Sequence, residues 1–126
     1  MLGLAWNTRD LAVPWARELE ALVGASGFAE AVSASQDPET AADAEAWWPR
    51  VPAPMSGRER ARFRAQHRLG SPDDVAALAS THSAVALRED RGEVLAQVRE
   101  LALGAAEPDG SVVVPLVCHC FRYRRP

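Results

Sequence analysis

The hydrophobic pattern begins with an apolar run at 2–6, Leu-Gly-Leu-Ala-Trp, that shows no polar alternation. Such a run is typical of a sheet strand that is covered on both faces. A polar tip follows at 7–10, in which Thr8 or Asp10 is a candidate cap for the next helix. Because nothing before this run can pair with it, we expect the chain to begin in the middle of a fold.

Three segments carry apolar residues at helical spacing. The first covers 13–23 and stops before Gly24. The second covers 72–82 and follows Ser71, a residue type that caps helices, with acidic residues in its first turn. The third covers 89–103. We therefore expect helices in these segments, and about four helices in the whole chain.

Two later segments favour strands. Residues 61–69 alternate cleanly, which predicts a half-exposed strand. One face of it carries Phe63, Ala65, His67 and Leu69, and the other carries Arg62, Arg64, Gln66 and Arg68. The arginine row is either a solvated face or an anion site. Residues 112–123 form the longest β-favouring run, in which Pro115 belongs near the strand start, at a bulge, or where its nitrogen faces away from the ladder.

A long segment at 33–60 separates the first helix from the second strand. It is rich in Ser, Ala, Asp, Glu and Pro, which break regular elements. Loops of this length are usually a lid, a substrate wall or partly disordered. Trp47 and Trp48 are expected to pin this loop to the body of the protein. The element order predicts a single α/β domain over 1–126 with a three-stranded sheet.

Length and composition narrow the classes of protein. The 126 residues suit one domain, and 48% apolar with 25% charged residues is ordinary for a globular protein. No run approaches the roughly 20 apolar residues of a membrane span, and no signal peptide is recognisable. The expected location is therefore cytoplasmic. A net charge of −3 argues against nucleic-acid binding.

The sequence has few motifs that indicate a catalytic or cofactor-binding site. The sequence has no G-x-G-x-x-G, no P-loop and no G-x-S-x-G elbow. Its two cysteines, Cys118 and Cys120, are too far apart on a strand for a relaxed disulfide, so we expect free thiols on the core face rather than a metal site. A nucleophile–base pair of Ser80 and His82 is disfavoured because their helical spacing points them to different faces.

The best positional candidate for ligand contact is the end of the first strand. Ligands of open α/β sheets bind outside the carboxyl ends of the strands. Trp6, Asn7 and Arg9 lie at or just past that end. The alternative is that Trp6 is a core residue and Asn7 belongs to a turn.

The motifs resemble those of a known family. Leu-Gly-Leu-Ala-Trp-Asn-Thr-Arg-Asp, followed by Val13-Pro14-Trp15, is similar to the fifth strand and following helix of class I S-adenosylmethionine-dependent methyltransferases that act on small molecules. The segment 61–125, which ends in Arg-Tyr-Arg-Arg, looks like the closing half of the same family. The likeness covers 1–23 and 61–125.

This resemblance implies a partial Rossmann-like sheet that holds the last three strands of seven. The last strand would be antiparallel and lie beside the fifth. The cofactor-binding half is absent, so S-adenosylmethionine belongs to the complete family fold and is not expected to bind this chain alone. By position, the substrate pocket would be lined by Trp6, Asn7, Trp15 and Ser80. His82 and Ser83 stand where relatives often carry Ser and an aromatic residue, and no role is assigned to them.

Two hypotheses about function follow. In the first, the chain is the substrate-side portion of a methyltransferase, with a small-molecule substrate and a possible companion chain that carries the cofactor half. In the second, it is a non-enzymatic α/β module that associates with a partner or forms a homodimer through its first strand. Neither hypothesis involves nucleic acid or a membrane.

Overall fold

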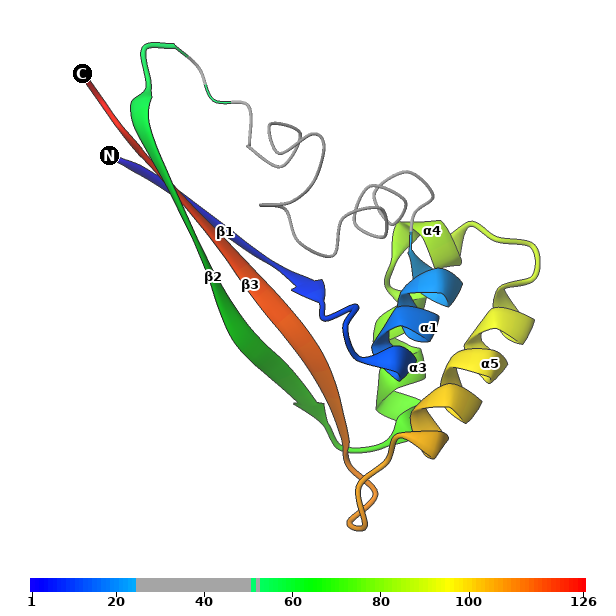
Figure 1. Cartoon of the computed structure of the whole chain (residues 1–126). Helices are drawn as coiled ribbons and strands as arrows, with labels where there is room; N and C mark the ends of the chain where they lie inside the picture. The colour runs from blue at the N-terminus through cyan, green and yellow to red at the C-terminus, as the bar shows by residue number, and fades with distance from the viewer. Residues whose placement is uncertain (25–50, 52) are drawn as a thin grey trace.

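The computed structural model describes residues 1–24, 51 and 53–126 (Figure 1). Most of the predicted 33–60 loop, with Trp47 and Trp48, lies outside these residues. In chain order the elements are β1 (Leu2–Arg9), α1 (Pro14–Val23), β2 (Ser56–Leu69), α3 (Pro72–Ser80), α4 (Ser83–Ala86), α5 (Arg91–Gly104) and β3 (Val112–Arg124). The predicted α/β class is confirmed.

The three strands form one sheet of order β1-β3-β2. The last strand, β3, lies in the middle and runs antiparallel to both neighbours, as predicted for the last strand. Its pairing with β1 extends from Leu2↔Tyr123 to Arg9↔Leu116. Because β1 and β2 are both antiparallel to β3, they run in the same direction on its two sides.

The hydrophobic core lies at one end of the sheet. Figure 1 shows α1, α3 and α5 grouped beside the ends of β1 and β2, while the rest of the sheet extends away from them. Val112 and Val114 of β3 are buried there against the apolar stripes of the helices. On α5 that stripe is the predicted one, with Val94, Val98 and Ala102 buried. We call the side of the sheet that carries Val112 and Val114 the helix face.

Pro115 is accommodated in the central strand by the end of the β1 ladder. The last β1 pair is Arg9↔Leu116, and the carbonyl of Pro115 accepts a hydrogen bond of 2.9 Å from Asp10 N. Within a strand the nitrogen and the carbonyl of one residue point to the same side. The nitrogen of Pro115 therefore points to the β1 side just past the end of the β1–β3 ladder, where no ladder hydrogen bond needs its N–H. This is the predicted position in which the nitrogen lies outside a ladder.

The first strand differs from its prediction in length and in burial. It continues through Asn7 and Thr8 to Arg9, so the polar tip belongs to the strand. Its side chains alternate between half-buried and exposed along most of its length, and none is fully buried. The expectation of cover on both faces is wrong for this chain because β1 is an edge strand beyond most of the helical layer.

The second strand begins earlier than predicted. It starts at Ser56, so 56–60 belong to β2 and not to the loop. A register shift between Ser56 and Glu59 interrupts its pairing with β3. Phe63, expected to share a face with Leu69, does so by strand alternation but is 58% exposed, because the helices cover the sheet only near Leu69.

The helix ends follow the predicted local chemistry except at the start of α1. Ser71 caps α3 by accepting a hydrogen bond from Asp74 N, as predicted. The cap predicted for α1 is wrong: Val13 occupies that position without a side-chain bond, and Asp10 instead accepts from Ala12 N. The first helix, α1, ends before Gly24, as predicted, and α5 continues to Gly104, past its predicted end at 103. No helix in the described ranges is both long and apolar enough to cross a membrane.

Leu19 tests the core. It is 2% exposed on α1, and replacing it with Ala should lower the free energy of unfolding by about 2 to 5 kcal/mol through lost burial and a residual cavity. Leu103→Ala on α5 is the matched control: Leu103 is 66% exposed, so its loss should change stability by less than about 0.5 kcal/mol. Urea unfolding followed by circular dichroism measures both, and equal losses would contradict this core.

Candidate functional site

A cavity of about 420 Å³ lies on the helix face, where β1, α1 and α3 end. Strands, helices and the α3–α4 connection all contribute to it. Its lining residues are Asn7, Thr8, Arg9, Leu11, Glu20, Val23, Gly24, His67, Leu78, His82, Ser83, Ala84, Val114 and Leu116. It is therefore built from segments that are far apart in the sequence.

The polar end of the cavity is an ion pair with a histidine beside it. Arg9, the last residue of β1, donates from Nη1 to Glu20 Oε2 on α1. Each of these side chains is 15% exposed. Nη2 of the same guanidinium lies 3.4 Å from Nε2 of His82. Arg9 thus ties the strand to α1 and to the turn after α3.

The surroundings of His82 favour its neutral form. Burial lowers the pKa of its imidazole, the positive charge of Arg9 lowers it further, and Glu20 opposes both effects. A neutral ring with Nε2 unprotonated accepts a hydrogen bond from Arg9. Because Nε2 has a single lone pair, it can take a proton from a bound group only when its contact with Arg9 opens.

Apolar side chains form another part of the cavity wall. Leu11 and Val114 are 7% and 6% exposed, and Val23 is 1% exposed. Leu78, at 39%, is the most exposed large apolar side chain that lines the cavity. Because these apolar side chains lie beside the ion pair of Arg9 and Glu20, the cavity is amphipathic.

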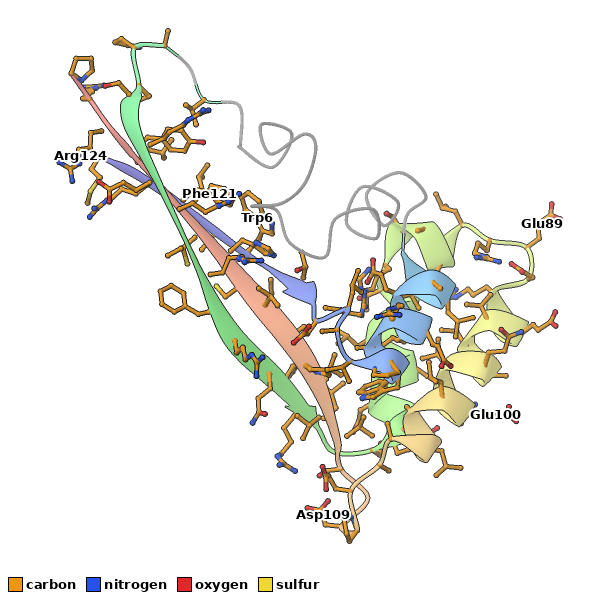
Figure 2. All side chains as sticks on the ribbon, in the orientation of Figure 1. Trp6, Glu89, Glu100, Asp109, Phe121 and Arg124 are labelled. Carbon is orange, nitrogen blue, oxygen red and sulfur yellow. The ribbon has the colours of Figure 1, made fainter. Side chains whose placement is uncertain are left out.

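The four residues predicted to line a pocket occupy different places. Asn7 is in the cavity wall and exposed. Trp6 points to the other face of the sheet, where it stacks on Phe121 at 4.6 Å between ring centroids (Figure 2). Trp15 packs partly buried against the core, and the hydroxyl of Ser80 donates to the carbonyl of Ala77 at 2.6 Å. The structure brings only Asn7 of the four into the cavity.

Sequence reasoning missed several lining residues. His82 and Ser83 were given no role, and Glu20 was one of many acidic residues on helices. Only the placement of Asn7 and Arg9 at the end of the first strand pointed to this region. A pattern that predicted α1 and α3 to end over the same strand would have found them, because both helix ends meet Arg9 in space.

A second histidine lies on the other face of the sheet. Nε2 of His119 is 2.9 Å from the hydroxyl of Thr8. Burial lowers the pKa of His119, and the charges of Arg62 and Arg60 lower it further. His119 is 3% exposed, so it serves the packing of β1 on β3 rather than an open site.

No protein-family model matches this sequence, and no curated protein matches it. Within the described residues, no group of three or more His, Cys, Asp or Glu side chains is placed to hold a metal ion. The roles of the cavity residues therefore rest on their geometry.

The charge of Arg9 offers a direct test of the site. In Arg9→Gln the pKa of His82 should rise, because a lowering charge is removed and Glu20 is left without its ion-pair partner. The pKa is measured by NMR titration of the imidazole carbon-bound protons. His119 is the internal control, since its shift comes from burial, Arg62 and Arg60. An unchanged or lower pKa of His82 would refute the described contact.

Proposed function

We propose that this chain is the C-terminal, substrate-side portion of an S-adenosylmethionine-dependent methyltransferase that acts on a small molecule, and that it is inactive alone. The observation that carries the proposal is the sheet order β1-β3-β2, with an antiparallel last strand beside β1. The resemblance of the Trp6-Asn7 and Val13-Pro14-Trp15 motifs implies this arrangement for the last strands of that family.

The outer edge of β1 supports the same proposal. In the described part of the chain, β1 pairs only with β3, so its other edge has no strand partner. In the complete family fold, strand four would occupy that edge. The half-buried Leu2 and Leu4 then gain cover from the companion half, which accounts for an apolar run on an edge strand.

The residues of this chain do not fit the cofactor. Among the described residues, the two glycines with positive φ, Gly57 and Gly110, lie outside the cavity, and the sequence has no glycine-rich turn. The ion pair of Arg9 and Glu20 is already satisfied within the chain. A companion chain would therefore have to supply the cofactor site.

What this chain contributes is orientation and a proton acceptor. The apolar walls hold the body of a small molecule, and Asn7 is placed to hydrogen-bond its polar group. When the contact of its Nε2 with Arg9 opens, His82 accepts the proton that a hydroxyl or amine must lose when it is alkylated. Methyl transfer depends mainly on such positioning.

Calorimetric titration with S-adenosylmethionine tests whether cofactor binding requires a companion chain. The chain alone should show no binding of S-adenosylmethionine, because it lacks the cofactor half. Co-purified with a companion that carries a glycine-rich half, sought first in the DNA upstream of Met1, it should bind one cofactor per complex. Micromolar affinity of the isolated chain for the cofactor would contradict the proposal.

Asn7→Ala in that complex tests the substrate side. Loss of one hydrogen bond to the acceptor should lower kcat/KM about fivefold or more while the Kd for the cofactor stays the same. Gln66→Ala is the matched control, an exposed amide of β2 that pairs opposite Pro115 and lies outside the cavity. Equal effects of the two substitutions would remove Asn7 from the site.

The unpaired edge of β1 also favours a second function, that of a non-enzymatic module that dimerises by strand addition. This alternative makes a different prediction from the first. Size-exclusion chromatography with light scattering should show a concentration-dependent dimer, and Ala5→Lys on β1 should restore the monomer because edge lysines block strand pairing. A wild-type monomer at high concentration would exclude the module.

A further inference from the structure

The two cysteines form a close pair on β3. Cys118 and Cys120 are both free and both partly buried, and their Sγ atoms lie 3.8 Å apart. As residues i and i+2 of a strand, they project from the same face. By the same alternation this is the helix face, which carries Val112 and Val114 further along the strand.

The surroundings leave the sulfurs accessible. The helices cover the other end of this face, as Figure 1 shows for α1, α3 and α5. Across the ladders, Cys118 lies opposite Asn7 and Phe63, and Cys120 lies opposite Ala5 and Ala61. Asn7, Phe63, Ala5 and Ala61 are all exposed, and the two alanines are small. No bulky buried side chain from the neighbouring strands therefore covers the pair.

The distance between the sulfurs matches metal ligation better than a disulfide. A disulfide requires an S–S separation of about 2.05 Å, which the 3.8 Å spacing far exceeds. Two thiolates on one tetrahedral zinc ion, each about 2.3 Å from it, lie about 3.8 Å from each other. The strand thus presents its thiols at the separation that a single thiophilic ion spans.

We infer that Cys118 and Cys120 form a chelating site for a soft, thiophilic metal or metalloid ion, held by both sulfurs at once. In the residues that the structure describes, no third His, Cys, Asp or Glu completes the set. A site with two thiolate ligands and open coordination positions favours soft metal ions over hard ions such as Mg²⁺. The site adjoins the cavity, because Asn7 lies opposite Cys118.

Cadmium is the first probe, because it is soft and forms thiolate charge-transfer absorption in the ultraviolet. Titration of the reduced full-length chain with Cd²⁺ should reach one ion per chain with that absorption. Cys118→Ser and Cys120→Ser should each weaken binding at least tenfold, as much as the double substitution, because a chelate needs both sulfurs. Binding that persists in either single variant, or no charge-transfer band in the wild type, would overturn the site.

A trivalent arsenical tests in the wild-type chain whether the two thiols bind one atom together. This test does not depend on the folding of any cysteine variant. Phenylarsine oxide joins two neighbouring thiols with the loss of one water: both S–H protons leave with the oxygen, and two S–As bonds form. We expect the intact mass to rise by one phenylarsenic group less two hydrogens, and both thiols to disappear from a thiol titration. An unmodified mass, or thiols that remain titratable, would show that the sulfurs do not act together.

Discussion

The antiparallel ladders of β3 are the constraint on which the rest of the structure depends. Neither β1 nor β2 pairs with the other within the described residues, so each joins the sheet only through β3. The first residues of β3, Val112 and Val114, form the floor of the helical core, and its later residues hold β1 in register from Leu116 to Tyr123. One strand therefore sets both the position of the core and the direction of the edge strand.

The register of β1 on β3 in turn determines the candidate site. Because Arg9 pairs with Leu116, the strand ends beside the helical layer, and its guanidinium reaches Glu20 and His82. A shift of one residue would turn Arg9 to the opposite face and separate these groups. The lowered pKa of His82 thus comes first from burial and then from the Arg9 charge that the sheet register places beside it.

The sequence predicted elements better than it predicted contacts. The helices, the α/β class and the antiparallel last strand follow from periodicity and from the family resemblance, and Ser71 follows from cap chemistry. The end of β1 was predicted wrongly because the polar residues Asn7, Thr8 and Arg9 look like a turn. Their backbone nevertheless pairs with β3, because ladder hydrogen bonds do not depend on side-chain polarity. Of the cavity, Asn7 and the region of Arg9 could be anticipated. His82 and Glu20 could not, because their roles depend on where α1 and α3 end over the sheet.

The apolar run at the start of the chain connects these findings. As a sequence it indicates an interior strand, yet in this structure it forms an edge with half-buried side chains. The two statements agree if the edge is covered by another chain, since an exposed apolar edge strand is otherwise an aggregation hazard. Both candidate functions use this edge, but only the methyltransferase proposal also accounts for a cavity at the end of the same strand. For that reason we place the substrate-side role first and treat strand-mediated self-association as its competitor.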